Sequence, residues 1–65
     1  MPAEDEDRLG TLVHALRTPL TIVEGFADAL ASRGEEMSGE ERAEYVERIG
    51  EAAREMRDLL DGVRR

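Results

Sequence analysis

The sequence contains no cysteine, no lysine and no tryptophan, and its only aromatic residues are Phe26 and Tyr45. Without cysteine the chain has neither a disulfide framework nor a thiolate metal site, which is compatible with a reducing cytosol. Because aromatic residues are scarce, the apolar content is aliphatic side chains and alanine, which suit helix packing better than a sheet. No stretch approaches the roughly 20 consecutive apolar residues of a membrane span, and no signal peptide is visible. We therefore expect a soluble, helical domain.

The length and charge narrow the class of protein further. A chain of 65 residues forms at most one small domain, which excludes a large enzyme core. Nine basic residues, all arginine, stand against sixteen acidic ones, giving a formal net charge of −7. This balance argues against nucleic acid or an anionic membrane as a partner. We expect the charged residues to form solvated helix faces.

Apolar residues recur with a seven-residue repeat in two segments, which predicts two amphipathic helices. We expect the first helix at about 5–33, a connection at 34–38 and the second helix at about 39–64. In the first helix the a and d positions hold Leu9, Leu12, Leu16, Pro19, Val23, Phe26 and Leu30, and the e positions hold Val13, Leu20 and Ala27. In the second, the a and d positions hold Val46, Ile49, Ala53, Met56, Leu60 and Val63, with Tyr45, Ala52 and Leu59 on a flanking row.

The connection between the helices carries its own signals. Gly34 is suited to the left-handed conformation that ends many helices. Ser38 and Glu41 form a Ser-x-x-Glu capping box that predicts the start of the second helix. Because the link is short, the helices should form an antiparallel hairpin. A lone hairpin would leave apolar surface in water, so we expect an all-α homodimer in which two hairpins form a four-helix bundle.

His14 is the only histidine, and the heptad register places it at an f position, away from the seam. It should therefore be exposed, with Thr18 one turn further along the same face. Pro19 lies in the helix interior, where proline costs about 3 kcal/mol and kinks the helix. From spacing alone, an ordinary surface histidine remains an alternative. A metal site is not expected, because no neighbouring helical ligand accompanies this one histidine.

The run His14-Ala-Leu-Arg-Thr-Pro-Leu-Thr21, continued by Gly25, Phe26 and Leu30, resembles the H-box of a known family. That family is the dimerisation and histidine-phosphotransfer (DHp or HisKA) domain of bacterial two-component sensor histidine kinases. The specific match covers about residues 14–30, and the hairpin pattern extends it over nearly the whole chain. The resemblance implies a phosphorelay in which His14 takes the γ-phosphoryl group of ATP and passes it to a response-regulator aspartate.

The resemblance also implies roles for the residues around His14. Thr18 would support dephosphorylation of the response regulator, and Pro19 would be the kink at which the helix bends between kinase and phosphatase arrangements. The receiver domain of the regulator would dock below His14, on Thr21, Ile22, Gly25 and the facing part of the second helix. No cofactor is expected in this chain, since ATP and Mg²⁺ would be held by a separate ATP-binding domain. The expected location is the cytoplasm, and it is compatible with a membrane-anchored parent protein.

Two features depart from a complete kinase. Family members usually carry an acid directly after the histidine, and here that residue is Ala15; general-base assistance is typically worth about 10² to 10⁴ in rate. The chain also has no glycine-rich nucleotide-binding motif, so it cannot phosphorylate itself unaided. It is expected to be an excised kinase domain or a stand-alone phosphotransfer protein. The competing hypothesis is a structural dimerisation or signal-relay hairpin with a vestigial histidine.

Overall fold

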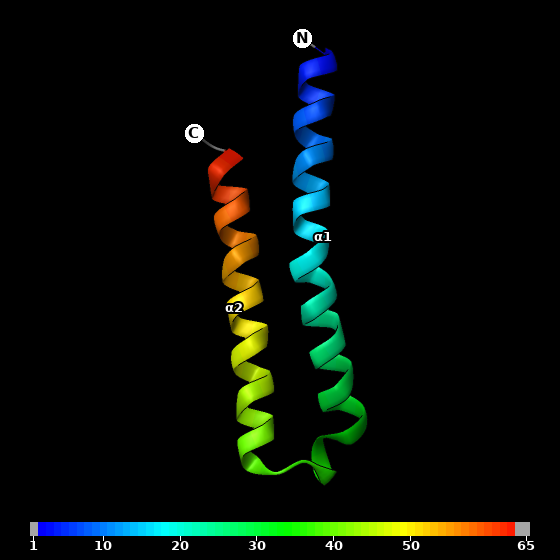
Figure 1. The fold of residues 1–65 in the computed structure, drawn as a ribbon, viewed down its shortest axis with the longest axis vertical. Helices are drawn as coiled ribbons and strands as arrows, with labels where there is room; N and C mark the ends of the chain where they lie inside the picture. The colour runs from blue at the N-terminus through cyan, green and yellow to red at the C-terminus, as the bar shows by residue number, and fades with distance from the viewer. Residues whose placement is uncertain (1, 64–65) are drawn as a thin grey trace.

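The computed structural model describes the backbone of residues 2–63 and the side chains of residues 6–62. It contains two long α-helices, α1 (Pro2–Arg33) and α2 (Gly39–Val63), joined through a 3-10 turn, η1 (Gly34–Glu36). The two helices lie side by side and run in opposite directions (Figure 1). The all-α antiparallel hairpin predicted from the heptads is therefore confirmed.

The ends of the helices differ slightly from the predicted ones. The first helix begins at Pro2, three residues before the predicted start at Asp5. Proline suits the first turn of a helix because the N–H that it lacks would have no partner there. The end predicted for the second helix, residue 64, lies outside the described residues, within which α2 extends to Val63.

The seam between the helices lies on the predicted a and d row of α1. Pro19 is completely buried, whereas Leu9, near the open end, is 60% exposed. Phe26 packs against Tyr45 of α2 with ring centroids 4.8 Å apart and an interplanar angle of 63°, a favourable edge-to-face arrangement. The half-buried members of the row are Leu12, Leu16, Val23, Phe26 and Leu30.

On α2, the residues that face α1 come from both predicted apolar rows. Val46, Ala53 and Leu60, predicted at a and d positions, are exposed. The row predicted to flank them lies in the seam instead, since Ala52 is buried and the other two members are half-buried: Tyr45 and Leu59. Adjacent rows lie about 100° apart on a helix, so a wide apolar stripe does not specify which part of it packs on the neighbour. Ile49 and Met56 are half-buried as expected, and the side chain of Val63 lies outside the described ones.

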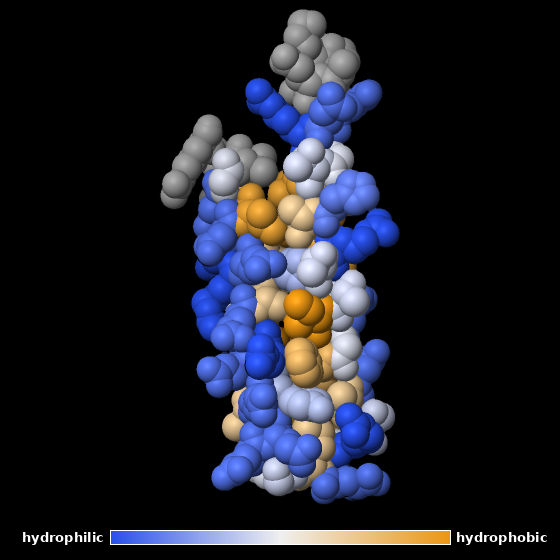
Figure 2. All heavy atoms as spheres, viewed as in Figure 1, coloured by the Kyte–Doolittle hydropathy of each residue, from blue (hydrophilic) through white to orange (hydrophobic). Residues whose placement is uncertain are grey.

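The hairpin therefore leaves one apolar row exposed on each helix. On α1 this row is the predicted e row, with Val13 52% and Leu20 45% exposed; on α2, Val46 is 59% and Leu60 50% exposed. Figure 2 shows apolar atoms gathered along the junction of the helices on one face, flanked by hydrophilic ones. The principal-axis extents are 52 × 19 × 10 Å, so the molecule is a layer one helix thick and cannot cover these rows itself.

The turn between the helices is fixed by short-range contacts. The capping box is confirmed: the Glu41 amide donates to the Ser38 Oγ at 3.1 Å, and the Ser38 amide donates to the Glu41 Oε1 at 3.3 Å. Met37 is only 8% exposed and closes the end of the hairpin. The expectation of a left-handed Gly34 was wrong, because no glycine among the described residues has a positive φ. Gly34 instead begins the 3-10 turn, and its carbonyl accepts the Met37 amide at 3.3 Å.

Candidate functional site

His14 lies in the N-terminal half of α1, on the side of the helix that faces solvent. Its side chain is exposed, as the heptad register predicted, and so is that of Thr18. Residues four apart are neighbours on a helix surface, so the two side chains share one accessible face. A second protein domain can approach the imidazole of His14 without displacing any part of this hairpin.

Pro19 interrupts the hydrogen bonding of α1 just after His14. It remains inside a continuous helix, but it has no N–H to donate to the carbonyl of Ala15, one turn earlier. Two residues later, the Thr21 hydroxyl donates to the Arg17 carbonyl at 2.9 Å, a side-chain bond that often accompanies helix bending. In Figure 1, α1 changes direction slightly in its cyan-to-green part, around its middle. The role of Pro19 as a kink between functional arrangements stays a prediction.

The three residues predicted to contact a regulator lie together, towards the turn from His14. Thr21, Ile22 and Gly25 are all exposed, with Ile22 at 40%. Gly25 has open space around it: a Cβ built there would meet nothing within 4 Å. The Thr21 hydroxyl proton is used within the helix, so this side chain offers a partner its remaining lone pairs and its methyl group.

A groove runs beside these residues, between α1 and α2. Ile22 and Phe26 form its α1 wall. Its α2 wall consists of Arg48, Glu51, Ala52 and Glu55. The groove continues towards the turn, where Gly25 and Ala29 line it with Phe26 and Tyr45. A contribution from α2 was predicted, but not which residues make it. The i, i+3, i+4 and i+7 spacing of these α2 residues places them on one helix face, a pattern that the sequence contains.

Ala15, at the position where the family usually carries an acid, lies in a different environment from His14. It is half-buried and lines a shallow apolar groove with Leu12 of α1 and Leu59 of α2. No aspartate or glutamate occurs anywhere from residue 8 to residue 23. The carboxylate nearest to His14 along α1 is that of Asp7, seven residues or about two turns before it, so no acid lies beside the imidazole to accept its proton.

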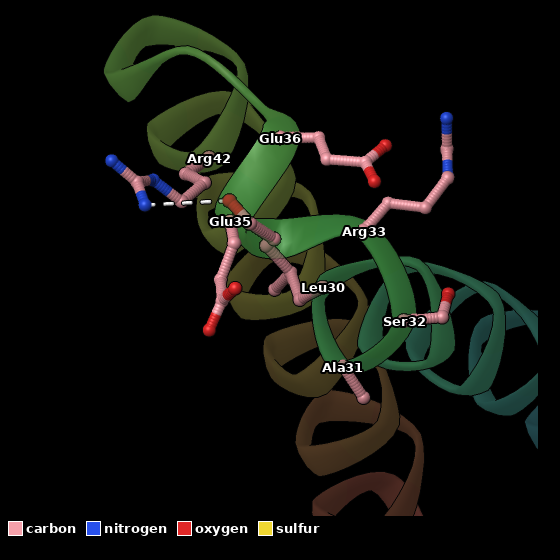
Figure 3. Close-up of a pocket in the computed structure, with 8 residues that line it drawn as sticks. Leu30, Ala31, Ser32, Arg33, Glu35, Glu36 and Arg42 are labelled. Atoms are coloured by element: carbon pink, nitrogen blue, oxygen red, sulfur yellow. Dashed lines mark hydrogen bonds between the residues drawn. The ribbon is translucent and has the colours of Figure 1, made fainter.

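A second, more polar pocket lies at the turn, about 30 Å along α1 from His14 at the helical rise per residue. Figure 3 shows the residues that line it, with the Arg42 guanidinium donating to the Gly34 carbonyl at 3.3 Å. The contact ties α2 to the turn. At that distance the pocket cannot take part in chemistry at His14.

Within the described residues, no three histidine or acidic side chains are grouped so that they could hold a metal ion. The described helices also include none that is long and apolar enough to cross a membrane.

Comparison with known families agrees with this geometry. The family model of the His Kinase A (phospho-acceptor) domain matches residues 6–65, nearly the whole chain. No curated protein and no solved structure matches this chain. The hairpin with an exposed histidine on its first helix is thus a phospho-acceptor domain of the histidine-kinase class. The chain belongs to the His Kinase A family.

Proposed function

We propose that this domain accepts a phosphoryl group on His14 and passes it to an aspartate of a response-regulator receiver domain. The observation that carries the proposal is the exposed His14 within a chain matched by the phospho-acceptor family over residues 6–65. Transfer requires two partner domains to reach the same ring atom in turn. The solvent-facing position of His14 on α1 meets that requirement.

The chemistry needs only a neutral imidazole. A neutral imidazole has one ring nitrogen without a proton, and the lone pair of that nitrogen can act as a nucleophile. A ring nitrogen of His14 attacks phosphorus, the bond from phosphorus to the donor oxygen breaks, and the electron pair leaves with that oxygen. The other ring nitrogen keeps its proton until solvent or a partner removes it. With ATP as donor, the nucleotide and Mg²⁺ are supplied by a separate ATP-binding domain, so we expect the domain to work in the cytoplasm.

The exposed apolar rows support dimerisation. Val13, Leu20 and Ala27 on α1 repeat every seven residues, and so do Val46, Ala53 and Leu60 on α2. Such rows stabilise a helical layer only when a second layer covers them. A second copy of the hairpin, related by a two-fold axis, covers both rows at once and produces a four-helix bundle.

The groove beside Ile22 supports docking of the receiver domain. It lies on the opposite flank of the hairpin from the exposed apolar rows, so a dimer would leave it accessible. Gly25 supports close approach: a glycine in an exposed helix interior costs about 0.5–1 kcal/mol relative to alanine, and no neighbour within this chain requires its small size. Thr18, exposed one turn after His14, is suited to orient a water for dephosphorylation of the regulator.

A second candidate function is a structural dimerisation or signal-relay hairpin whose histidine is vestigial. Ala15 favours this alternative, because the helix around His14 holds no carboxylate that could assist phosphorylation. The two functions share the fold and the dimer. They differ only in whether His14 carries phosphate.

The first experiment supplies ATP and the ATP-binding domain of the parent kinase in trans to the unaltered domain and to Ala15→Glu. Acid-labile phosphate on His14 is then measured. Labelling of the unaltered domain is the expected result, at a lower rate than for Ala15→Glu. Labelling of Ala15→Glu alone would identify a sound scaffold whose kinase step is disabled. Labelling of neither would favour the structural hairpin.

A further inference from the structure

The charges of this chain are distributed unevenly around His14. Acidic residues make up sixteen of the 65, yet none occurs between residues 8 and 23. Within four residues of His14 on either side, Arg17 is the only charged residue. The incoming phosphoryl donor is an anion, and it approaches a chain of net charge −7. A cation beside His14 is therefore the one local group that can offset this repulsion.

Arg17 is placed to act on a group bound to His14. The two residues are three apart on α1, which puts their Cβ atoms about 5–6 Å from each other. Both side chains are exposed. The Arg17 carbonyl accepts a hydrogen bond from the Thr21 hydroxyl. The Arg17 guanidinium takes no part in this hydrogen bond.

The guanidinium also has no competing partner on its own helix. Carboxylates that pair with a helical arginine lie three or four residues away, and those positions around Arg17 hold Val13, His14, Leu20 and Thr21. Among the described side chains, the arginine whose guanidinium donates a hydrogen bond is Arg42, at the turn. The five N–H donors of Arg17 are thus available to a ligand.

We propose that the Arg17 guanidinium binds the oxygens of the phosphoryl group while it is transferred to and from His14. The inference rests on the proposed function, since it requires His14 to be the acceptor. A guanidinium matches phosphoryl oxygens in a planar, two-pronged geometry that an ammonium group cannot reproduce. As the bond from phosphorus to the leaving atom of the donor breaks, the electron pair departs with that atom and negative charge remains on the three oxygens of the group in transit. Arg17 stabilises that charge without accepting or donating a proton.

This role explains how His14 can react beside Ala15. The acid that the family usually carries after the histidine accepts the imidazole proton or fixes the tautomer of the ring. Here the assistance acts on the phosphoryl group and not on the imidazole, because Arg17 binds the phosphoryl oxygens. The same contact serves both directions of transfer, since the phosphoryl group has the same oxygens in each.

The test uses phosphoramidate, a small donor that needs neither the ATP-binding domain nor a receiver domain. The rate of His14 phosphorylation is measured by phosphorus NMR for the unaltered chain, Arg17→Gln and Arg17→Lys. The matched control is Arg57→Gln, which removes the same charge from an exposed arginine of α2. We expect Arg17→Gln to lower the rate about tenfold or more, as loss of one charge-stabilising donor commonly does. Arg17→Lys should fall in between, and Arg57→Gln should match the unaltered chain.

Each outcome decides a different point. Equal rates for Arg17→Gln and the unaltered chain would overturn the role of Arg17 and leave His14 as acceptor. Equal losses in Arg17→Gln and Arg57→Gln would also overturn it, by showing a general charge effect. No phosphorylation of the unaltered chain would instead refute the proposed function. Because Arg17 is exposed, helicity and melting of all three variants should match those of the unaltered chain. If Arg17→Gln alone unfolds, the rate of the folded Arg17→Lys decides: a rate below that of the unaltered chain supports the role of Arg17, and an equal rate overturns it.

Discussion

The two ends of the hairpin are built differently. At the turn, Met37 is buried, Phe26 packs edge-to-face on Tyr45, and Ser38 and Glu41 cap α2 reciprocally. At the open end, by contrast, Leu9 and Leu60 are at least half exposed. His14 lies in that less enclosed half. The stabilising contacts within one chain therefore concentrate away from His14, and the surroundings of His14 are open to other protein surfaces.

The sharpest test of this division is His14→Gln. Glutamine keeps an exposed polar side chain on α1 but has no nucleophilic ring nitrogen. We expect complete loss of acid-labile phosphate, with helicity and oligomeric state unchanged, because His14 contributes nothing to the seam. The measurement pairs phosphate labelling with analytical ultracentrifugation. Unchanged signalling by the parent kinase carrying this substitution would establish the vestigial-histidine alternative.

A second test separates the two flanks of the hairpin. Leu20→Glu places a charge in the exposed row of α1 and should dissociate the dimer, because burying an unpaired carboxylate costs several kcal/mol. The matched control is Ile22→Glu, which is two residues away and similarly exposed, but lines the groove on the other flank. It should leave the dimer intact and slow transfer to the receiver domain. Sedimentation equilibrium measures the first effect and a phosphotransfer time course the second.

The reverse pattern, with Ile22→Glu dissociating the dimer and Leu20→Glu leaving it intact, would place the dimer interface on the groove side. Two dissociating variants would mean that both flanks are buried between copies.

The capped end gives a smaller effect. Ser38→Ala removes the side chain that accepts the Glu41 amide and should lower the free energy of unfolding by about 1 kcal/mol. Denaturation with urea measures this change. Phosphorylation of His14 should be unaffected, since the cap lies at the far end of the molecule. A loss of labelling without a loss of stability would contradict the separation between the two ends.

Gly25→Ala should have the smallest effect on folding and the opposite sign. Alanine raises the free energy of unfolding by about 0.5–1 kcal/mol in a helix interior, and no neighbour clashes with the new Cβ. If a partner approaches closely at Gly25, transfer to the receiver domain should nevertheless slow. Gly62→Ala is the control, because that glycine also has open space around it but lies in the last turn of α2. Stabilisation with unchanged transfer would remove Gly25 from the docking surface.

Features set by neighbouring residues along the chain could be predicted from the sequence, whereas features set by packing between the two helices could not. The capping box at Ser38 and the exposure of His14 follow from local spacing, and both were predicted correctly. The sequence left open whether Val46 or Tyr45 packs on α1, because both lie on one wide apolar stripe and packing against α1 selects between them. Gly34 was misassigned for a related reason: its left-handed conformation was one of several ways to end a helix, and the chain forms a 3-10 turn instead.

The buried position of Pro19 in the seam has a mechanical consequence. Seventeen residues of α1 precede it, a rigid arm of about 25 Å at the helical rise per residue. Each degree of change in the bend at Pro19 therefore swings the far tip by about 0.4 Å but shifts His14, five residues away, by only about 0.1 Å. Were α1 to bend at Pro19 as predicted, a large displacement at its N-terminal end would become a small displacement of the His14 ring.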